Sequence, residues 1–83
     1  MHVSKKFWLT FPTQLEVERP IIYHMSRAFP DVVFDIRQAT ISDAIGIMAV
    51  LLEGDAEQVR GAVDFLREGG VRVDPIEKTV LEG

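Results

Sequence analysis

The sequence contains no cysteine, so neither a disulfide nor a thiolate metal site can form. Its longest unbroken apolar run, Ile47 to Leu52, is far shorter than the ~20 residues that a membrane-spanning helix needs. The N-terminal segment carries Lys5 and Lys6 but no apolar signal core behind them, because polar residues and Pro12 interrupt it. These absences predict a cytoplasmic protein with no membrane insertion.

Basic residues are also few. Nine Lys and Arg stand against thirteen Asp and Glu, which gives a formal net charge of −4. Affinity for nucleic acids depends mainly on Lys and Arg contacts to phosphates, so we expect no nucleic-acid partner. A chain of 83 residues has room for one domain. A domain of this size buries only about 60–65% of its unfolded surface, so self-association is the expected source of further stability.

Periodicity predicts six secondary-structure elements. Proline at position 20 opens the first helical pattern, whereas Asp55 with Gln58 resembles a capping box and Gly69-Gly70 is a typical helix stop. Alternating or β-prone segments lie between the helices. The expected elements are a strand at 6–11, a helix at 20–29, a strand at 32–39, a loop at 40–44, a strand at 45–53, a helix from 55 to the glycine pair and a strand at 71–76.

This β-α-β-β-α-β order predicts an α+β, ferredoxin-like sandwich. Its four-stranded antiparallel sheet would have the strand order 4-1-3-2, with both helices on one face. The whole chain, 1–83, is expected to be a single domain with its core at about 6–76 and a polar C-terminal tail at 77–83.

Apolar residues exceed what two helices can cover. In the third strand Met48, Val50 and Leu52 share one face, while Ile47, Ala49 and Leu51 share the other. An uncovered apolar face usually marks an interface or a ligand site, unless edge loops cover it. We therefore expect a symmetric homodimer that uses the free face or an adjacent edge, and the predicted interface residues are Trp8, Met48, Val50 and Leu52.

Catalytic and metal-binding patterns are weak. Neither His2 nor His24 has a carboxylate or a second histidine at helical spacing, and no serine has a base at a recognisable spacing. The acidic cluster at 53–57 is explained by a strand end, a helix cap and a first-turn acid. The sequence predicts a protein that is not an enzyme and that holds no metal or cofactor.

Four stretches of the chain resemble the NIL domain family. They are Leu9-Thr-Phe-Pro12, Arg19-Pro-Ile-Ile-Tyr23, the stretch from Gly46 to Gly54 and the stretch from Ala62 to Val71. Such domains occur at the C-terminus of the ATPase subunit of methionine ABC importers, fused to ferredoxin modules, and as standalone small proteins. The resemblance implies an ACT-like ferredoxin fold that dimerises and, in the transporter, methionine binding at the domain pair.

The family is named for an Asn-Ile-Leu run, and the matching positions here are Asp35, Ile36 and Arg37. Asp35 could accept a bond from a ligand ammonium and Arg37 could hold a carboxylate, but a cross-strand, solvent-facing ion pair is the simpler explanation of both residues. Gly46 would allow close backbone approach, unless it only serves a bulge or a turn. Met48 would contact the ligand, unless it fills the core or an interface. The predicted ligand-binding residues are thus Asp35, Ile36, Arg37, Gly46 and Met48.

Two functions remain open. One is a standalone regulatory domain that binds methionine or a related sulfur amino acid at a dimer interface. The other is a non-enzymatic dimerising adaptor that docks on a protein partner of sulfur assimilation or iron–sulfur chemistry.

Overall fold

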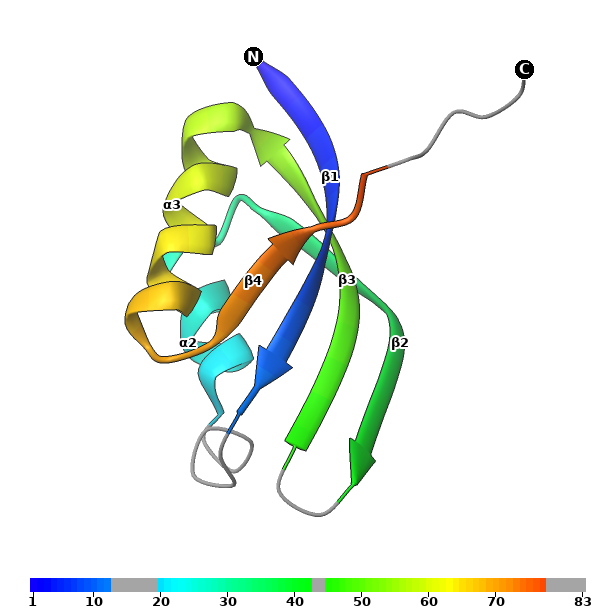
Figure 1. Cartoon of the computed structure of the whole chain (residues 1–83). Helices are drawn as coiled ribbons and strands as arrows, with labels where there is room; N and C mark the ends of the chain where they lie inside the picture. The colour runs from blue at the N-terminus through cyan, green and yellow to red at the C-terminus, as the bar shows by residue number, and fades with distance from the viewer. Residues whose placement is uncertain (13–19, 43–44, 78–83) are drawn as a thin grey trace, which may run out of the picture.

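The computed structural model describes residues 1–12, 20–42 and 45–77. Its elements are β1 (His2–Phe11), α2 (Ile21–Ala28), β2 (Val33–Ser42), β3 (Ile45–Asp55), α3 (Ala56–Glu68) and β4 (Arg72–Pro75). The strands form one sheet in the order β2-β3-β1-β4, and every neighbouring pair is antiparallel. Both helices lie on one face of this sheet (Figure 1).

The predicted ferredoxin-like α+β fold is therefore confirmed. The observed order is the expected 4-1-3-2 read from the opposite edge. Neither described helix is long and apolar enough to cross a membrane, since α2 has 8 residues and α3 has 13.

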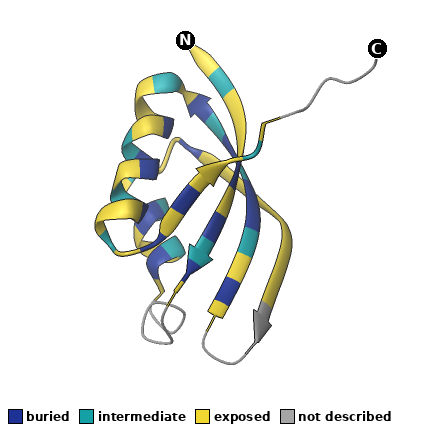
Figure 2. Cartoon of the chain, viewed as in Figure 1, coloured by how far each residue is buried: buried dark blue, intermediate teal, exposed yellow. Residues whose placement is uncertain are grey.

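The core lies between the sheet and the two helices. Along most of β1 and β3 the more buried residues alternate with more exposed ones, and each helix turns one face toward the sheet (Figure 2). The largest fully buried side chains come from both layers, and they are Leu9, Met25, Val50, Leu52 and Leu66.

The ends of α3 follow from local chemistry. Asp55 caps the helix as predicted, because its carboxylate accepts a 3.1 Å bond from the backbone N–H of Glu57. At the other end the N–H of Val71 donates to Leu66 and the N–H of Gly70 donates to Arg67, each at 3.0 Å. This is the Schellman arrangement, and Gly70 adopts the positive φ of 97° that it requires.

A glycine also sets the contact between the helices. A Cβ atom on Gly61 of α3 would lie 2.6 Å from Cε1 of Phe29, the residue that ends α2. Phe29 in turn meets Phe65 edge-to-face, with the ring centroids 6.2 Å apart. The absence of a side chain at position 61 thus makes room for the Phe29 ring.

Two expected boundaries were wrong. β1 begins at His2 instead of residue 6, because the sheet continues to its pair with Asp55 of β3. Residues 40–42 belong to β2 and not to a loop, since Thr40 pairs with Ile47 and Ser42 with Ile45. An edge strand keeps one side in solvent, so a polar sequence is compatible with pairing there. Residues 78–83 of the expected tail lie outside the described residues.

Candidate functional site

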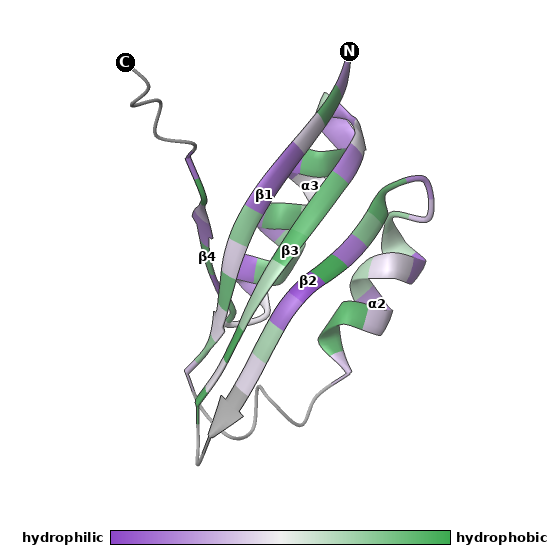
Figure 3. Ribbon diagram, turned by 90° about the vertical axis from the view of Figure 1, so that its right-hand side faces the viewer, coloured by the Kyte–Doolittle hydropathy of each residue, from purple (hydrophilic) through white to green (hydrophobic). Residues whose placement is uncertain are grey.

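One face of the sheet carries no helix. The strand register places its residues in rows, because residues directly opposite each other point to the same side. Across β1 and β3 these rows pair Lys6 with Leu51, Trp8 with Ala49 and Thr10 with Ile47. Figure 3 looks onto this face, with α3 behind β1 and β3.

Apolar side chains remain exposed on this open face, as the sequence predicted. Trp8 is 39% exposed and Ile47 is 42% exposed, although Ala49, which pairs with Trp8, is buried. Val33 and Ile45 are also exposed, at opposite ends of the pair formed by β2 and β3. Charged residues such as Lys6 and Glu53 lie among them, so the face is mixed and not uniformly apolar.

Two of the four residues predicted for the dimer interface, Val50 and Leu52, are buried within the single chain. Val50 and Leu52 are 1% and 0% exposed, because they share the helix-covered side of the sheet with Leu9. Met48 lies on that same side and packs, half-buried, against the core. Only Trp8 lies on the open face, where its β3 neighbours are Ile47, Ala49 and Leu51.

The predicted ligand residues lie on both sides of the sheet. Asp35 pairs with Leu51 and so belongs to the open face, where Nε of Arg37 lies 3.4 Å from its Oδ2. Both side chains are more than half exposed, which matches the ion pair that the sequence left as one alternative. Ile36 pairs with Val50 on the opposite side, and a bulge separates it from Gln38 in the ladder.

Gly46 is buried in the hairpin. It pairs with Phe11 on one side and with Ile41 on the other, so it lies within both ladders of the central strand. Its backbone groups are thereby engaged in the sheet. The two flanking strands therefore leave no opening through which a ligand could reach this backbone, as the sequence suggested it would.

A second apolar surface lies along β2, on the side of the helices. Phe34 and Ile36 point to the helix-covered side, yet they are 36% and 46% exposed. β2 is the edge strand of the sheet, and every residue from Val33 to Thr40 is exposed. We call Phe34, Ile36 and the half-buried Met48 the β2 shelf. Sequence periodicity could not identify the shelf, because it does not reveal how far α2 reaches over the sheet.

The acidic end of β3 contains contacts that the sequence did not suggest. Nε2 of His2 lies 3.0 Å from Oε2 of Glu53, across 51 residues of sequence. The α-amino group of Met1 lies 3.1 Å from Oδ1 of Asp55. That hydrogen bond, with a smaller contribution from the backbone N–H of Glu57, lowers the pKa of Asp55 below its usual range.

These groups do not assemble into a metal site. Within residues 1–12, 20–42 and 45–77, no three His, Asp or Glu residues converge in a way that could hold a metal ion. His24 is exposed on α2, and its ring contacts the Tyr23 ring edge-on at 5.4 Å between centroids. The pair formed by His2 and Glu53 is exposed on the open face.

Comparison with solved structures supports the architecture. The C-terminal domain of an ABC transporter ATP-binding protein from Enterococcus faecalis superposes with a TM-score of 0.74 and 25% identity, over 90% of this chain and 86% of that one. An amidase of the hydantoinase/carbamoylase family from Burkholderia phymatum superposes with a TM-score of 0.66 and 11% identity, over 94% of this chain and 29% of that one. The de novo designed protein Foldit4 gives 0.58 and 17%, over 95% and 100%. The last two similarities concern the fold alone.

No curated protein is a significant match to the sequence. The family model of the NIL domain, however, matches residues 9–75, which include five of the six elements in full or nearly so. The match extends over much more than half of the chain, and it agrees with the similarity to the C-terminal domain of a transporter ATPase. This chain therefore belongs to the NIL domain family.

Proposed function

We propose that the protein is a non-catalytic regulatory domain that binds methionine, or a related sulfur amino acid, between two copies of itself. The observation that carries the proposal is the NIL family match over residues 9–75. The similarity to the C-terminal domain of an ABC transporter ATP-binding protein also supports a regulatory role.

The β2 shelf is the part of this chain that best suits the proposal. Phe34, Ile36 and Met48 offer apolar contacts to a thioether side chain, and Met48 is itself a polarizable, adaptable surface. Among the described residues no strand pairs with the outer edge of β2, which is ten residues long and which a second copy could cover. Asp35 and Arg37 lie on the opposite side of the same strand. They would therefore contact the second copy at the dimer edge and not a ligand held on the β2 shelf.

A thermal-shift titration against the common amino acids, homocysteine and S-adenosylmethionine tests the proposal. Ligand at about one hundred times its dissociation constant adds roughly 2.7 kcal/mol to the free energy of unfolding. For a domain this small, the midpoint should rise by about ten degrees. No rise with any of these compounds, at concentrations well above their cellular levels, would refute ligand sensing.

A matched pair of variants then locates the site. Ile36→Glu places a charge on the β2 shelf, whereas Ile47→Glu places the same charge on the open face at a similar exposure. We expect only Ile36→Glu to abolish the methionine shift and to produce monomers in size-exclusion chromatography with light scattering. If instead only Ile47→Glu had these effects, the dimer would form through the open face.

The adaptor function is favoured by one observation. The five predicted ligand residues are divided between the two sides of the sheet, so no single described surface gathers them. An adaptor needs only the exposed apolar surfaces and no converging polar groups. A protein that remains dimeric, yet shows no thermal shift with any amino acid, would support the adaptor over the sensor.

A further inference from the structure

β1 is much longer than its neighbour β4. Residues 7–10 of β1 pair with β4, and one further bond follows where the N–H of Ile76 donates to the carbonyl oxygen of Lys6 at 2.9 Å. β1 nevertheless extends to His2, held on its other side by β3. Within the part of the chain that the structure describes, nothing pairs with the β4-side edge of His2–Lys5.

The orientation of the unpaired groups follows from the last bond. In an antiparallel ladder the N–H and C=O of one residue point to the same neighbour, and successive residues alternate. Since Lys6 points toward β4, Ser4 and His2 also point to that side, whereas Lys5 points to β3. Ser4 and His2 thus present two backbone donors and two acceptors at an open edge.

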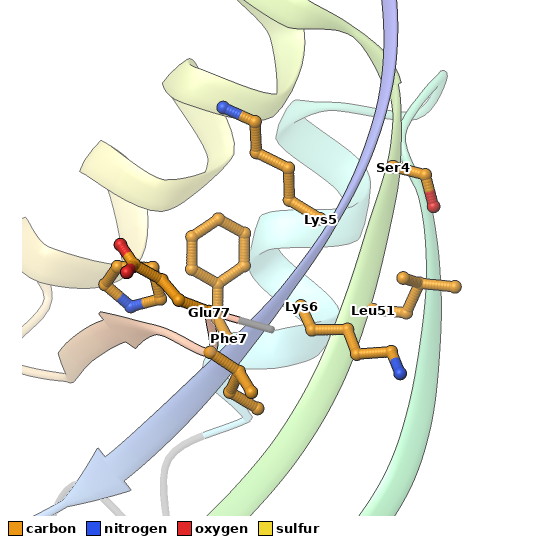
Figure 4. Close-up of a pocket in the computed structure, with 8 residues that line it drawn as sticks. Ser4, Lys5, Lys6, Phe7, Leu51 and Glu77 are labelled. Atoms are coloured by element: carbon orange, nitrogen blue, oxygen red, sulfur yellow. The ribbon is translucent and has the colours of Figure 1, made fainter. Parts of the chain in front are cut away.

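Two hollows flank this edge. The first has a volume of about 520 Å³ and takes residues from both faces of the sheet, as Figure 4 shows: Ser4 and Lys6 point to one side of β1, and Lys5 and Phe7 point to the other. The second has a volume of about 290 Å³ and lies between β1 and α3, with Val3, Val59 and Val63 on its floor. Lys5, Phe7 and Pro75 line both hollows, so the two meet at the strand edge.

The hollows carry positive charge in an acidic protein. Four of the nine basic residues of the chain line them, against two acidic residues; the six are Lys5, Lys6, Arg60, Arg67, Asp64 and Glu77. Arg67 also donates a 2.9 Å bond to the carbonyl oxygen of Val73, which fixes its guanidinium beside the hollow. An acidic partner would therefore be attracted to this one edge while the rest of the surface repels it.

We infer that the edge of β1 at His2–Lys5 is a docking site for an extended acidic peptide segment of a protein partner, which adds to the sheet as a strand. Strand addition needs a free backbone edge for main-chain bonds and hollows on both sides for alternating side chains. This edge has both. Apolar side chains of the partner occupy the hollow against α3, and the acidic side chains that alternate with them meet Lys6 on the open face. The site is separate from the β2 shelf and does not depend on methionine binding.

Fluorescence anisotropy tests the docking with a defined probe. The probe is a fluorescein-labelled, end-capped Glu-Val-Glu-Val-Glu peptide, and its matched control has Lys in place of each Glu. We expect saturable binding of the acidic peptide to the full chain below about 1 mM protein, weakened by added salt, and no binding of the basic peptide. Equal binding of both peptides, or none of either, would overturn the inference.

A pair of charge reversals places the peptide. Lys6→Glu changes an exposed residue at the hollow, and Arg27→Glu also reverses a positive charge but on α2, away from it. Lys6→Glu should weaken binding at least tenfold, whereas Arg27→Glu should change it less than twofold. Similar losses in both variants would show a response to net charge alone and would refute a site at β1.

Amide hydrogen exchange gives a readout that does not depend on any variant. The N–H groups of His2 and Ser4 should exchange rapidly in the free protein and slowly with the acidic peptide, because they gain main-chain partners. The N–H of Lys5 faces β3 and should stay protected in both samples, as an internal control. Protection of Ser4 before the peptide is added would show that the chain's own segment fills the edge, which would also overturn the inference.

Discussion

Gly61 provides the sharpest test of how the two helices meet. In the interior of a helix, replacing glycine by alanine normally stabilises the fold by about 1 kcal/mol, because alanine has the higher helix propensity. At this position, however, the new Cβ would lie 2.6 Å from Cε1 and 2.9 Å from Cζ of Phe29. Overpacking of this kind costs typically ~1–3 kcal/mol.

The two effects oppose each other, and the steric effect should prevail. The Phe29 ring cannot withdraw freely, because it packs against the core and edge-on against Phe65. We expect Gly61→Ala to lower the free energy of unfolding by about 1 kcal/mol, which for a domain of this size corresponds to a fall of about 4–8 °C in the thermal midpoint. Urea denaturation followed by circular dichroism measures both variants directly.

A double-mutant cycle separates the two effects. Phe29→Leu removes Cε1 and Cζ but retains side-chain carbons at the Cδ position, whose nearest ring counterpart lies at an ordinary 3.5 Å from the new Cβ. In the Phe29→Leu background, Gly61→Ala should become stabilising by about 1 kcal/mol, with a coupling energy of roughly 1–3 kcal/mol between the sites. If Gly61→Ala stabilises the unmodified protein by the full helix-propensity amount, the close approach of the helices at position 61 is refuted.

Three further predictions concern other parts of the fold. Leu52→Ala should lower the free energy of unfolding by about 2–5 kcal/mol because Leu52 is fully buried, whereas Leu51→Ala on the open face should lower it much less. Equal losses of the two variants in urea denaturation would contradict the assignment of the two faces. Gly70→Ala should destabilise by about 1–2 kcal/mol at its positive φ, and Gly70→Asn by less, since asparagine tolerates that conformation; identical values would argue against the Schellman stop. The lowered pKa of Asp55 means that its carboxylate stabilises the fold fully above the ordinary value near 3.8, and that this contribution is lost as the pH falls through the lower folded pKa. The denaturation midpoints of Asp55→Asn and of the unmodified protein should thus differ at pH 6 and converge near pH 2. If the difference between the midpoints were as large at pH 2 as at pH 6, the charge of Asp55 would have no part in stabilising the fold.

The order of elements was predictable because each boundary has a local cause. Asp55 and the Gly69-Gly70 pair start and stop α3 through bonds that span only a few residues, so their chemistry is visible in the sequence. Two similar β-α-β halves then leave one common architecture for a chain of this length. The family resemblance pointed to the same fold, and the family match confirms it.

The candidate site was less predictable, because it depends on which face of each strand is covered. Both rows of β3 are apolar, so the alternation that normally distinguishes the core from the surface is missing there. The pairing of β3 with β1 decides the matter, since it puts Val50 and Leu52 on the side of Leu9 and leaves Leu51 on the open face. Contacts between residues distant in sequence, such as that of His2 with Glu53, are equally invisible until the register is known.

The sequence by itself determined the class of protein: the six elements, their order, the absence of cysteine chemistry, and an excess of apolar residues that predicted an uncovered surface. These properties arise from composition and from interactions a few residues apart. Only the tertiary structure decided where the uncovered surfaces lie, namely the open face around Trp8, the β2 shelf and the unpaired edge at His2–Lys5. The physical reason is that exposure depends on strand register, on relative strand length and on the reach of each helix over the sheet, and all three are set by packing between distant segments of the chain.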